Sequence, residues 1–269
     1  MLRTRVVTAI ILALGLLAIL FLLPQPAVAA ALALMLAAAA WEWAGLIGAA
    51  ECQRRAYALL TPLPCALLYI AGMPAAVLFG LWLVALVFWL IIVPLWLAKK
   101  WKLRAAPSAY LVGWLLLLPT WAAMLALYAR SPLHLLAAMA LVWVADIAAY
   151  FAGHAWGRHK LAAQISPGKT WEGALGGAAG VVVYGFVVAA AAALPLSASN
   201  LFWLLAALLL ATAISVVGDL FESLAKRQAG AKDSSGLLPG HGGILDRIDS
   251  LTSTLPLLAL LLRLVPDHG

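Results

Sequence analysis

Long apolar runs separated by short polar gaps dominate the chain. Prolines such as Pro24, Pro74 and Pro132 stand in the gaps, where they end helices. The apolar runs are continuous on every face, whereas the strands of a membrane barrel alternate apolar and polar residues. The pattern predicts an all-α, polytopic transmembrane helix bundle of about nine spans. These spans fall near residues 6–23, 27–48, 57–72, 74–97, 109–129, 133–152, 172–196, 200–222 and 251–265.

Composition supports the same interpretation. The 269 residues are 66% hydrophobic and 10% charged, whereas a soluble domain carries roughly 25% charged residues. A soluble fold of this length has no interior large enough for so much apolar surface, so lipid must be the solvent for most of the chain. The sequence has no internal repeat that would divide it into two units, so one integrated membrane domain is the simplest organisation. Within it we distinguish N-terminal spans (1–130) from a C-terminal portion that carries the chemistry (131–269).

The basic residues predict the orientation. If the N-terminus is cytoplasmic and nine spans follow, fifteen of the seventeen Lys and Arg residues fall on the cytoplasmic side, and Arg130 and Arg263 fall outside. The formal charge of +7 therefore reflects topology, and we expect no nucleic-acid partner. Arg3, Arg5 and the following apolar run resemble a cleavable signal peptide, but a retained signal-anchor helix is favoured because every later segment is also membrane-bound. Cys52 and Cys65 are too few for a disulfide framework.

Carboxylates near span ends are the first candidates for chemistry. Seven of the ten acidic residues lie between residues 146 and 249, at predicted cytoplasmic ends of spans or in cytoplasmic loops. Asp146 lies within a span, where a carboxylate costs roughly 2.5–3.5 kcal/mol and marks a polar cavity or functional site. Ser215, Asp219, Glu222 and Lys226 recur at spacings of four, three and four, which places them on one stripe of a helix. The alternative is a buried structural ion pair between Asp219 and a neighbouring lysine.

The segment from Ser223 to Asp249 is the densest polar stretch. Its basic residues can donate charge-assisted hydrogen bonds to phosphate oxygens, and its glycines allow close approach of the backbone to a ligand. Asp246 and Asp249 share a helix face, and two hard carboxylates suit Mg²⁺. Taken singly, the glycines fit a tight loop and the basic residues a solvated patch. Taken together, bracketed by carboxylates, they indicate a phosphate and metal site.

A second polar stretch joins the spans near 133–152 and 172–196. Ser166 or Thr170 can cap the following helix. The functional interpretation is a triphosphate clamp made by Lys169 and the first amides of that helix, whose dipole favours anions. Topology places this stretch on the same side of the membrane as Asp219 to Asp249. His241 is ambiguous, because a lone histidine is more often structural than catalytic.

These residues resemble the phosphatidate cytidylyltransferase (CDP-diacylglycerol synthase) family. Its signature is similar to the run Ser223–Asp249, through Lys226-Arg227, Lys232-Asp233, Pro239, His241-Gly242-Gly243 and Asp246-Arg247-Ile248-Asp249. Two further motifs resemble Ser166–Gly173 and Asp146 with Tyr150 and Gly153. Ala225 stands where a larger aliphatic residue is usual, and Gly168 stands where a lysine is common, which removes one possible phosphate contact. The strong match covers roughly the C-terminal half.

The resemblance implies a reaction in which CTP and phosphatidate give CDP-diacylglycerol and pyrophosphate. It implies catalytic roles for Asp219, Lys226, Asp246 and Asp249. It implies Mg²⁺ held by Asp146, Asp219, Asp246 and Asp249, with a second cation as an open alternative. The implied substrate-binding residues are Ser166, Lys169, Thr170, Ser223, Arg227, Lys232, Asp233, His241, Gly242, Gly243 and Arg247. The expected location is the inner (plasma) membrane with the site facing the cytoplasm, and a homodimer is compatible with it.

Two other functions deserve comparison. A CDP-alcohol phosphotransferase shares the nucleotide-lipid chemistry but needs a D-G-x-x-A-R motif that this chain lacks, whereas a close relative acting on an ether lipid stays open. A transporter would use Asp146 and Asp219 as a proton or cation site. Transporters often carry inverted repeats, while this chain concentrates its polar residues in one half and on one side.

Overall fold

The computed structural model describes residues 2–192 and 197–264, with side chains from residue 5 onward. The far ends of the expected spans 172–196 and 251–265, and the Arg3 side chain, lie outside the described residues. Helices account for almost all of the described chain, as the apolar pattern predicts. Their bounds are α1 (Leu2–Leu22), α2 (Gln25–Leu46), α3 (Glu51–Leu60), α4 (Pro62–Ile70), α5 (Ala75–Val87), a π-helical turn η1 (Phe88–Ile92), α6 (Val93–Lys99), α7 (Pro107–Arg130), α8 (Pro132–Trp156), α9 (Trp171–Ala191), α10 (Ala198–Gln228) and α11 (Leu245–Leu264).

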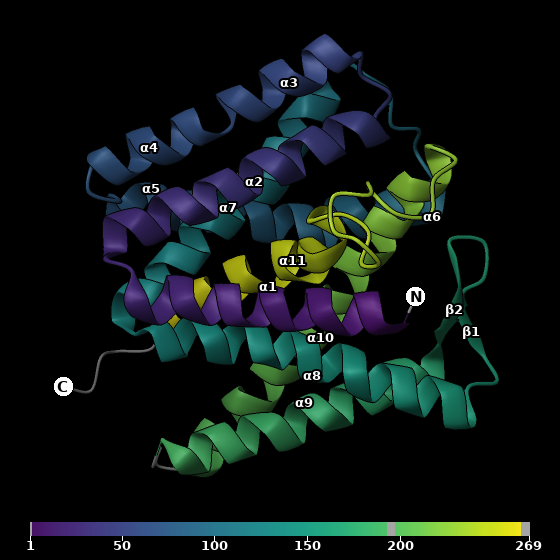
Figure 1. The fold of residues 1–269 in the computed structure, drawn as a ribbon. Coiled ribbons are helices and arrows are strands. Elements are labelled where there is room, and N and C mark those ends of the chain that lie inside the picture. The colour runs from purple at the N-terminus through teal and green to yellow at the C-terminus, as the bar shows by residue number, and fades with distance from the viewer. Residues whose placement is uncertain (1, 193–196, 265–269) are drawn as a thin grey trace.

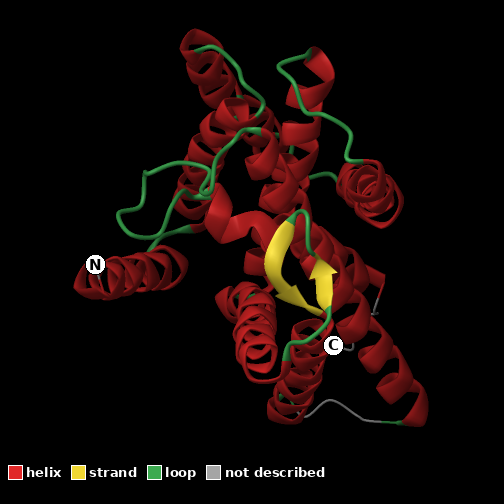
Figure 2. Ribbon diagram, turned by 90° about the vertical axis from the view of Figure 1, so that its right-hand side faces the viewer, coloured by secondary structure: helices red, strands yellow, loops and turns green. Residues whose placement is uncertain are grey.

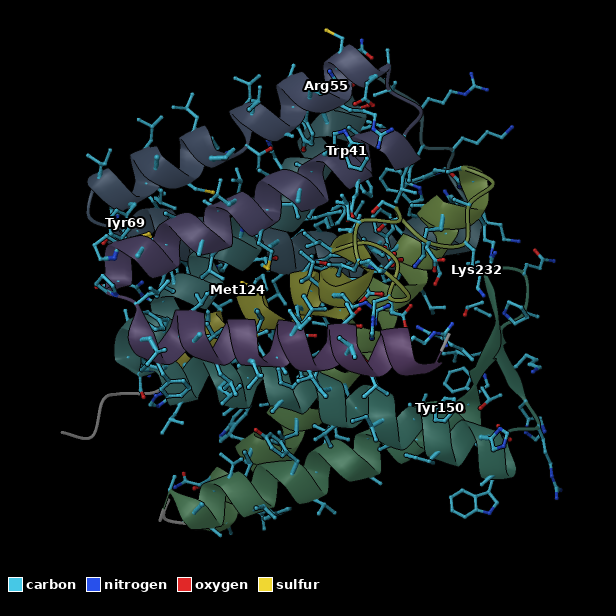
Figure 3. All side chains as sticks on the ribbon, viewed as in Figure 1. Trp41, Arg55, Tyr69, Met124, Tyr150 and Lys232 are labelled. Carbon is cyan, nitrogen blue, oxygen red and sulfur yellow. The ribbon has the colours of Figure 1, made fainter. Side chains whose placement is uncertain are left out.

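The long helices lie beside one another and alternate in direction (Figure 1). The N-terminus, α6, and the loop between α10 and α11 (residues 229–244, hereafter the α10–α11 loop) gather at one end of the bundle, which we call the polar end. Lys232 and Tyr150 lie toward this end, and Tyr69 lies toward the other (Figure 3). The alternation brings the two polar stretches of the sequence to the same end, as the charge pattern predicts.

Seven helical segments of the described chain are long and apolar enough to cross a membrane, against the nine spans expected. One difference lies at residues 51–70, where α3 and α4 meet at Thr61-Pro62 and are each too short to cross alone. The other is α11, whose first turns carry Asp246, Arg247 and Asp249 and lower its hydropathy. In Figure 1 α3 and α4 run beside α2 as one broken rod, and α11 lies inside the bundle, partly covered by α1.

A short hairpin interrupts the helical pattern between α8 and α9. Strands β1 (Lys160–Ala162) and β2 (Ser166–Thr170) pair antiparallel and stand out from the helices in Figure 2. Thr170 caps α9, because its side-chain oxygen accepts a hydrogen bond from the Gly173 N–H at 3.1 Å, as expected. At the start of α9, Glu172 accepts from the His159 backbone N–H at 3.2 Å. These two hydrogen bonds fix the hairpin to the N-terminus of α9.

Close packing of α8 on α9 positions this hairpin. A Cβ atom added at Gly176 would come within 2.2 Å of the Ala152 Cβ, and one at Gly180 within 2.6 Å of the Ala148 Cβ. Small residues let two membrane helices approach closely and gain dispersion contacts that lipid alone does not provide. The packing extends to the polar end, where a Cβ at Gly173 would lie 2.9 Å from the Ala149 carbonyl oxygen.

An aromatic cluster fixes α2, η1, α6 and α10 against one another. Phe221 of α10 is buried and packs on Trp43 (ring centroids 6.1 Å apart), Phe88 (5.9 Å), Trp89 (5.8 Å) and Trp96 (5.5 Å). The indole N–H groups find backbone acceptors: Trp43 donates to the Ala109 carbonyl at 2.9 Å and Trp89 to the Thr252 carbonyl at 3.1 Å. The cluster lies one residue from Glu42 on α2 and one residue from Glu222 on α10.

Candidate active site

The polar stripe of α10 faces the inside of the bundle. Ser215 and Glu222 are buried, and Lys226 is 13% exposed. The Lys226 ammonium donates to Glu222 Oε2 at 2.7 Å and to Asp246 Oδ1 at 2.6 Å. A buried ammonium requires such partners, since an unpaired charge away from water is strongly unfavourable. Lys226 therefore ties α10 to the start of α11.

The other oxygen of Asp246 holds the α10–α11 loop. Oδ2 accepts from the Ser234 N–H at 2.8 Å, the Ser234 hydroxyl at 2.9 Å and the Gly243 N–H at 2.8 Å. The loop also closes on itself, because the Leu238 N–H donates to the Gly242 carbonyl at 2.8 Å. Gly242 adopts a φ of +78°, and a Cβ there would also lie 2.7 Å from Asp246 Oδ2. The glycine therefore permits both the turn and the close approach to the carboxylate.

The hairpin reaches the same region from the other side. Lys169 forms an ion pair with Asp219 Oδ2, and Ser223 donates to Asp219 Oδ1 at 3.3 Å. This pair differs from the alternative interpretation of the stripe, a buried ion pair of Asp219 with a neighbouring lysine, because its lysine comes from the second polar stretch. Because Lys169 and Asp219 are partly open, at 24% and 29% exposed, the pair lines a cavity rather than closing one.

Two cavities open beside this network. The hairpin cavity, of about 450 Å³, is lined by Asp146, Tyr150, Ser166, Lys169, Thr170 and Asp219, among others. The loop cavity, of about 510 Å³, is lined by Arg5, Lys232, Asp233, His241 and Arg247, among others. His241 Nδ1 is buried and has no hydrogen-bond partner among the described residues, so this side chain retains a free polar atom beside the loop cavity.

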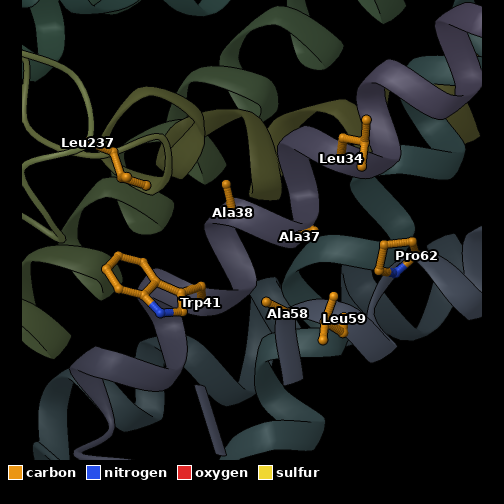
Figure 4. Close-up of a pocket in the computed structure, with 8 residues that line it drawn as sticks. All are labelled: Leu34, Ala37, Ala38, Trp41, Ala58, Leu59, Pro62 and Leu237. Carbon is orange, nitrogen blue, oxygen red and sulfur yellow. The ribbon is translucent and has the colours of Figure 1, made fainter. Parts of the chain in front are cut away.

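An apolar groove lies on the outer side of the same loop. Leu34 and Trp41 of α2, Leu59 and Pro62 of the broken rod, and Leu237 of the α10–α11 loop contribute to its lining (Figure 4). Its volume is about 360 Å³. Residues 235–238 separate this groove from the loop cavity, since Ser235, Gly236 and Leu238 line the cavity. An apolar surface and a cationic cavity therefore meet at one segment of chain.

Negative charge exceeds positive charge in the network. Five carboxylates, those of Asp146, Asp219, Glu222, Asp246 and Asp249, interact with one another and with three basic groups, Lys169, Lys226 and Arg247. The formal excess is two negative charges. Glu222 Oε1 is also buried and has no hydrogen-bond partner within the described part of the chain. A divalent cation fits this chemistry, because Mg²⁺ prefers hard carboxylate oxygens.

The four carboxylates predicted to hold metal do not form one ligand set. Within the described residues, no three His, Cys, Asp or Glu side chains are grouped as a metal site. Asp246 is engaged by Lys226 and the loop, while Asp146 and Asp219 line the hairpin cavity. Asp249 interacts electrostatically with Asp219 and Glu222. Mg²⁺ usually takes one or two protein carboxylates together with substrate phosphates, so a three-residue group is not required.

Most of the other residues predicted to bind substrate line one of the two cavities, and the rest support a cavity from outside. Ser166, Thr170, Lys232, Asp233, His241, Gly242 and Arg247 line one of the two cavities. Thr170 uses its side-chain oxygen as the cap of α9, and Gly243 contributes its N–H to Asp246. Arg227 lies in neither cavity lining: its guanidinium donates to the Ile165 carbonyl at 3.4 Å and supports the hairpin.

Three further residues belong to the region. Glu222 stands on the predicted stripe without a predicted role in the site. Arg5 appeared only as a topology determinant, yet it lines the loop cavity, and Thr8 of the same helix donates to the Pro239 carbonyl at 3.0 Å. Glu42 of α2 is fully buried and contacts the α10–α11 loop. The sequence could have indicated a role for Glu42, because a carboxylate inside an apolar span is costly and unusual.

Comparison with known proteins gives one family. The Cytidylyltransferase family profile matches residues 3–265. The chain is 42% identical to the phosphatidate cytidylyltransferase of Pseudomonas aeruginosa over 275 aligned residues, which cover 97% of each chain. Shorter matches are to enzymes of the same name, at 47% identity over 134 residues in Haemophilus influenzae (48% of this chain, 46% of the relative) and 53% over 122 residues in Brucella suis (45% and 43%).

Gly243 offers a test of this geometry. A Cβ at this position would lie 2.1 Å from the Ser234 hydroxyl and 2.3 Å from Glu42 Oε1, both in a packed region. We expect Gly243→Ala to displace these groups, at a stability cost of about 1–3 kcal/mol, the scale of overpacking, measured as thermal unfolding in detergent. Gly236→Ala in the same loop is the matched control, because nothing lies within 4 Å of its added Cβ. Equal melting temperatures for the two variants would contradict the close packing.

Proposed function

This chain belongs to the phosphatidate cytidylyltransferase family, whose enzymes make CDP-diacylglycerol, and we propose that its reaction takes place around Asp219, Lys226 and Asp246. It is a multi-span membrane nucleotidyltransferase of phospholipid synthesis, as the resemblance of its motifs indicated. The observation that carries the proposal is the ion pair between Lys169 and Asp219. It joins the hairpin to α10, between the hairpin cavity and the loop cavity.

The substrates are CTP and phosphatidate. An oxygen of the phosphatidate phosphate forms a bond to the α-phosphorus of CTP. The bond from that phosphorus to the oxygen bridging it to the β-phosphorus breaks, and pyrophosphate leaves with the electron pair. The attacking oxygen is already anionic, so no side chain has to remove a proton from it. The protein's tasks are then to hold two anions in line and to neutralise their charge.

The basic residues supply that neutralisation. Lys226 is held between Glu222 and Asp246 at 2.7 and 2.6 Å, so its ammonium is fixed in place before any substrate arrives. A preorganised donor is worth more than a mobile one, because no reorganisation is needed during the reaction. Lys169 is held by Asp219, and substrate phosphate can compete with that carboxylate for its ammonium.

Asp219 and Asp249 are the side chains that would hold Mg²⁺, with Asp146 beside them. The clustering of these carboxylates supports this assignment, since Asp249 interacts with both Asp219 and Glu222. Asp246 Oδ1 is shared with Lys226 and keeps room for one further contact. When bound, the cation supplies charge neutralisation at the phosphate oxygens, and a second cation stays a further proposal.

The two cavities suit the two substrates differently. The loop cavity contains Arg5, Lys232 and Arg247 against one carboxylate, Asp233, which favours the triphosphate of CTP. The hairpin cavity lies between the lipid-facing spans α8 and α9, and Ala149, Ala174 and Val216 contribute to its walls. We assign the phosphatidate headgroup, in place of the triphosphate that the sequence suggested for Lys169, to the hairpin cavity, where the acyl chains can remain in the bilayer.

The proposed location is the inner (plasma) membrane with the polar end in the cytoplasm, where CTP is available. Nine crossings follow if α3 with α4 and α11 are counted beside the seven long segments. Under this arrangement the N-terminus is cytoplasmic, and positive charge gathers on that side. A homodimer is compatible with this topology.

Catalysis is tested with pure protein, radiolabelled CTP and phosphatidate in detergent micelles. We expect labelled CDP-diacylglycerol from the wild type. Asp246→Asn removes the ion pair with Lys226 and should lower turnover by roughly 100-fold or more, the scale for loss of a preorganised electrostatic contact. Glu51→Gln, at an exposed ion pair with Arg55, is the control expected to keep full turnover. Absence of product from the wild type would refute the function, and full activity of Asp246→Asn would remove that residue from the site.

The assignment of substrates to cavities predicts opposite kinetic effects for two lysines. Lys232→Ala should raise the KM for CTP about ten- to a hundredfold with little effect on the KM for phosphatidate, since one charged contact is worth roughly 1.5–3 kcal/mol. Lys169→Ala should raise the KM for phosphatidate. Steady-state kinetics with each substrate varied in turn measure both constants. The reverse pattern would exchange the two substrates between the cavities.

Orientation is tested by labelling single cysteines in sealed inner-membrane vesicles of known sidedness. In a Cys52→Ser background, Leu237→Cys should react with a membrane-impermeant maleimide from the cytoplasmic side, because Leu237 is 47% exposed at the polar end. Ser199→Cys, near the start of α10 at the other end, should react from the opposite side. Labelling of position 237 from the periplasmic side would overturn the orientation.

A further inference from the structure

Glu42 is a buried carboxylate that the reaction as described does not use. It lies in the apolar span α2 between Trp41 and Trp43 and has no exposed surface. A carboxylate in such a position is costly unless hydrogen-bond donors surround it. The structure shows where these donors come from, and they lie about 200 residues away along the chain.

Three donors and one shared hydroxyl converge on the two oxygens of Glu42. Oε1 accepts from the Ser235 hydroxyl at 2.6 Å and the Ile244 N–H at 2.9 Å. Oε2 accepts from the Leu245 N–H at 2.6 Å and lies 3.3 Å from the Ser234 hydroxyl, whose one proton is shared with Asp246 Oδ2 at 2.9 Å. All four belong to the α10–α11 loop or the first residue of α11. Glu42 therefore binds both ends of the segment from Ser234 to Leu245.

Two of the donors to Glu42 are backbone N–H groups at the N-terminus of a helix. Ile244 and Leu245 stand at the N-terminus of α11, where the first amides of a helix have no partner within the helix. A carboxylate there satisfies them and interacts favourably with the helix dipole. Glu42 thus acts as a cap for α11 that is supplied by a different helix, and the cap lies directly before Asp246.

Glu42 also shares a ligand with Asp246. The Ser234 hydroxyl contacts Glu42 Oε2 and Asp246 Oδ2, at 3.3 and 2.9 Å. The loop is consequently held between two carboxylates, one on α2 and one on α11. Since Asp246 in turn holds Lys226, a continuous set of contacts runs from Glu42 to the fixed ammonium.

The helix that carries Glu42 is itself immobilised. The adjacent Trp43 stacks on Phe221 of α10 and donates to the Ala109 carbonyl of α7. Phe221 immediately precedes Glu222, the other partner of Lys226. Packed aromatic rings therefore set the distance between Glu42 and the Lys226 site. Since Glu42 also holds the α10–α11 loop, the loop has a fixed position relative to α2 and α10.

From these contacts we propose that Glu42 is a positioning residue for cytidylyl transfer, which holds the α10–α11 loop and Asp246 in the conformation that binds CTP. The inference rests on the proposed function. Glu42 itself lines neither cavity, so it acts through Ser234, Ser235 and the start of α11. The loop carries Lys232 and His241 beside the loop cavity, and their placement depends on this anchor.

A carboxylate is required at this position because the Ser235 hydroxyl and the Ile244 and Leu245 N–H groups, with the shared Ser234 hydroxyl, need two acceptor oxygens. In Glu42→Gln one oxygen becomes an NH₂ group, which would face either the Ile244 or the Leu245 N–H. Two donors facing each other cannot bond, so one anchor of the loop is lost while the side-chain volume is kept. We expect kcat/KM for CTP to fall about 10–100-fold, the range for residues that orient a site indirectly, mainly through KM.

The experiment compares Glu42→Gln with Glu51→Gln, an identical chemical change at an exposed carboxylate. KM and kcat for both substrates are measured well below the melting temperature of each variant, with folded protein quantified by gel filtration. A purely structural role would lower the melting temperature and leave the kinetic constants of the folded protein unchanged. Wild-type constants in folded Glu42→Gln would overturn the proposal. Absence of product from the wild type would instead refute the function itself.

A second measurement keeps the proposal testable if Glu42→Gln does not fold. Ser235→Ala deletes one donor to Glu42 and the acceptor of the Leu237 N–H at 3.1 Å, and it leaves the carboxylate and its other contacts in place. We expect a smaller rise in the KM for CTP, about two- to fivefold, together with faster maleimide labelling of Leu237→Cys as the loop loosens. Unchanged KM and an unchanged labelling rate in Ser235→Ala would contradict the role of Glu42.

Discussion

Lys226 is the group on which the arrangement of the polar end depends. Its ammonium, 13% exposed, lies between the carboxylates of Glu222 and Asp246. Removing an ammonium from water is strongly unfavourable without such partners, so α10, which carries Lys226 and Glu222, and α11, which carries Asp246, have to meet at this point. The second oxygen of Asp246 then binds Ser234 and Gly243. One buried ion pair thus determines where two helices and the loop between them lie.

The lipid environment explains why so few residues define the site. Apolar side chains distinguish poorly between neighbouring helices in a bilayer, and small residues or polar contacts decide which helices pair. Gly176 and Gly180 bring α9 against α8, and Lys169 at the end of the hairpin then reaches Asp219. Packing of α8 on α9 and the ion pairs of α10 meet at the same end, which places the hairpin cavity and the loop cavity on two sides of one cluster.

Periodicity and local motifs were sufficient for part of this arrangement. The stripe through Ser215, Asp219, Glu222 and Lys226 follows from helical spacing, and Thr170 as a cap follows from its place before a helix. The contacts of Glu42 could not be predicted in this way, because Ser235 and Leu245 lie 193 and 203 residues further along the chain. The spacing of residues within one helix does not predict contacts between segments so far apart in the sequence. The break between α3 and α4 was also missed, since residues 57–72 are apolar enough for one span and Pro62 divides the helix at Thr61.

The central claim is that Asp219, Asp249 and the fixed Lys226 surround the reacting phosphate groups. A structure of the protein with Mn²⁺ and a non-hydrolysable CTP analogue tests it most directly, because anomalous scattering locates the metal independently of the model of the ligand. We predict an anomalous peak within about 2.5 Å of Asp219 and Asp249 oxygens, with the α-phosphate beside Lys226 and the distal phosphates toward Lys232. A metal and triphosphate bound away from these carboxylates, with Lys226 still buried between Glu222 and Asp246, would contradict the account.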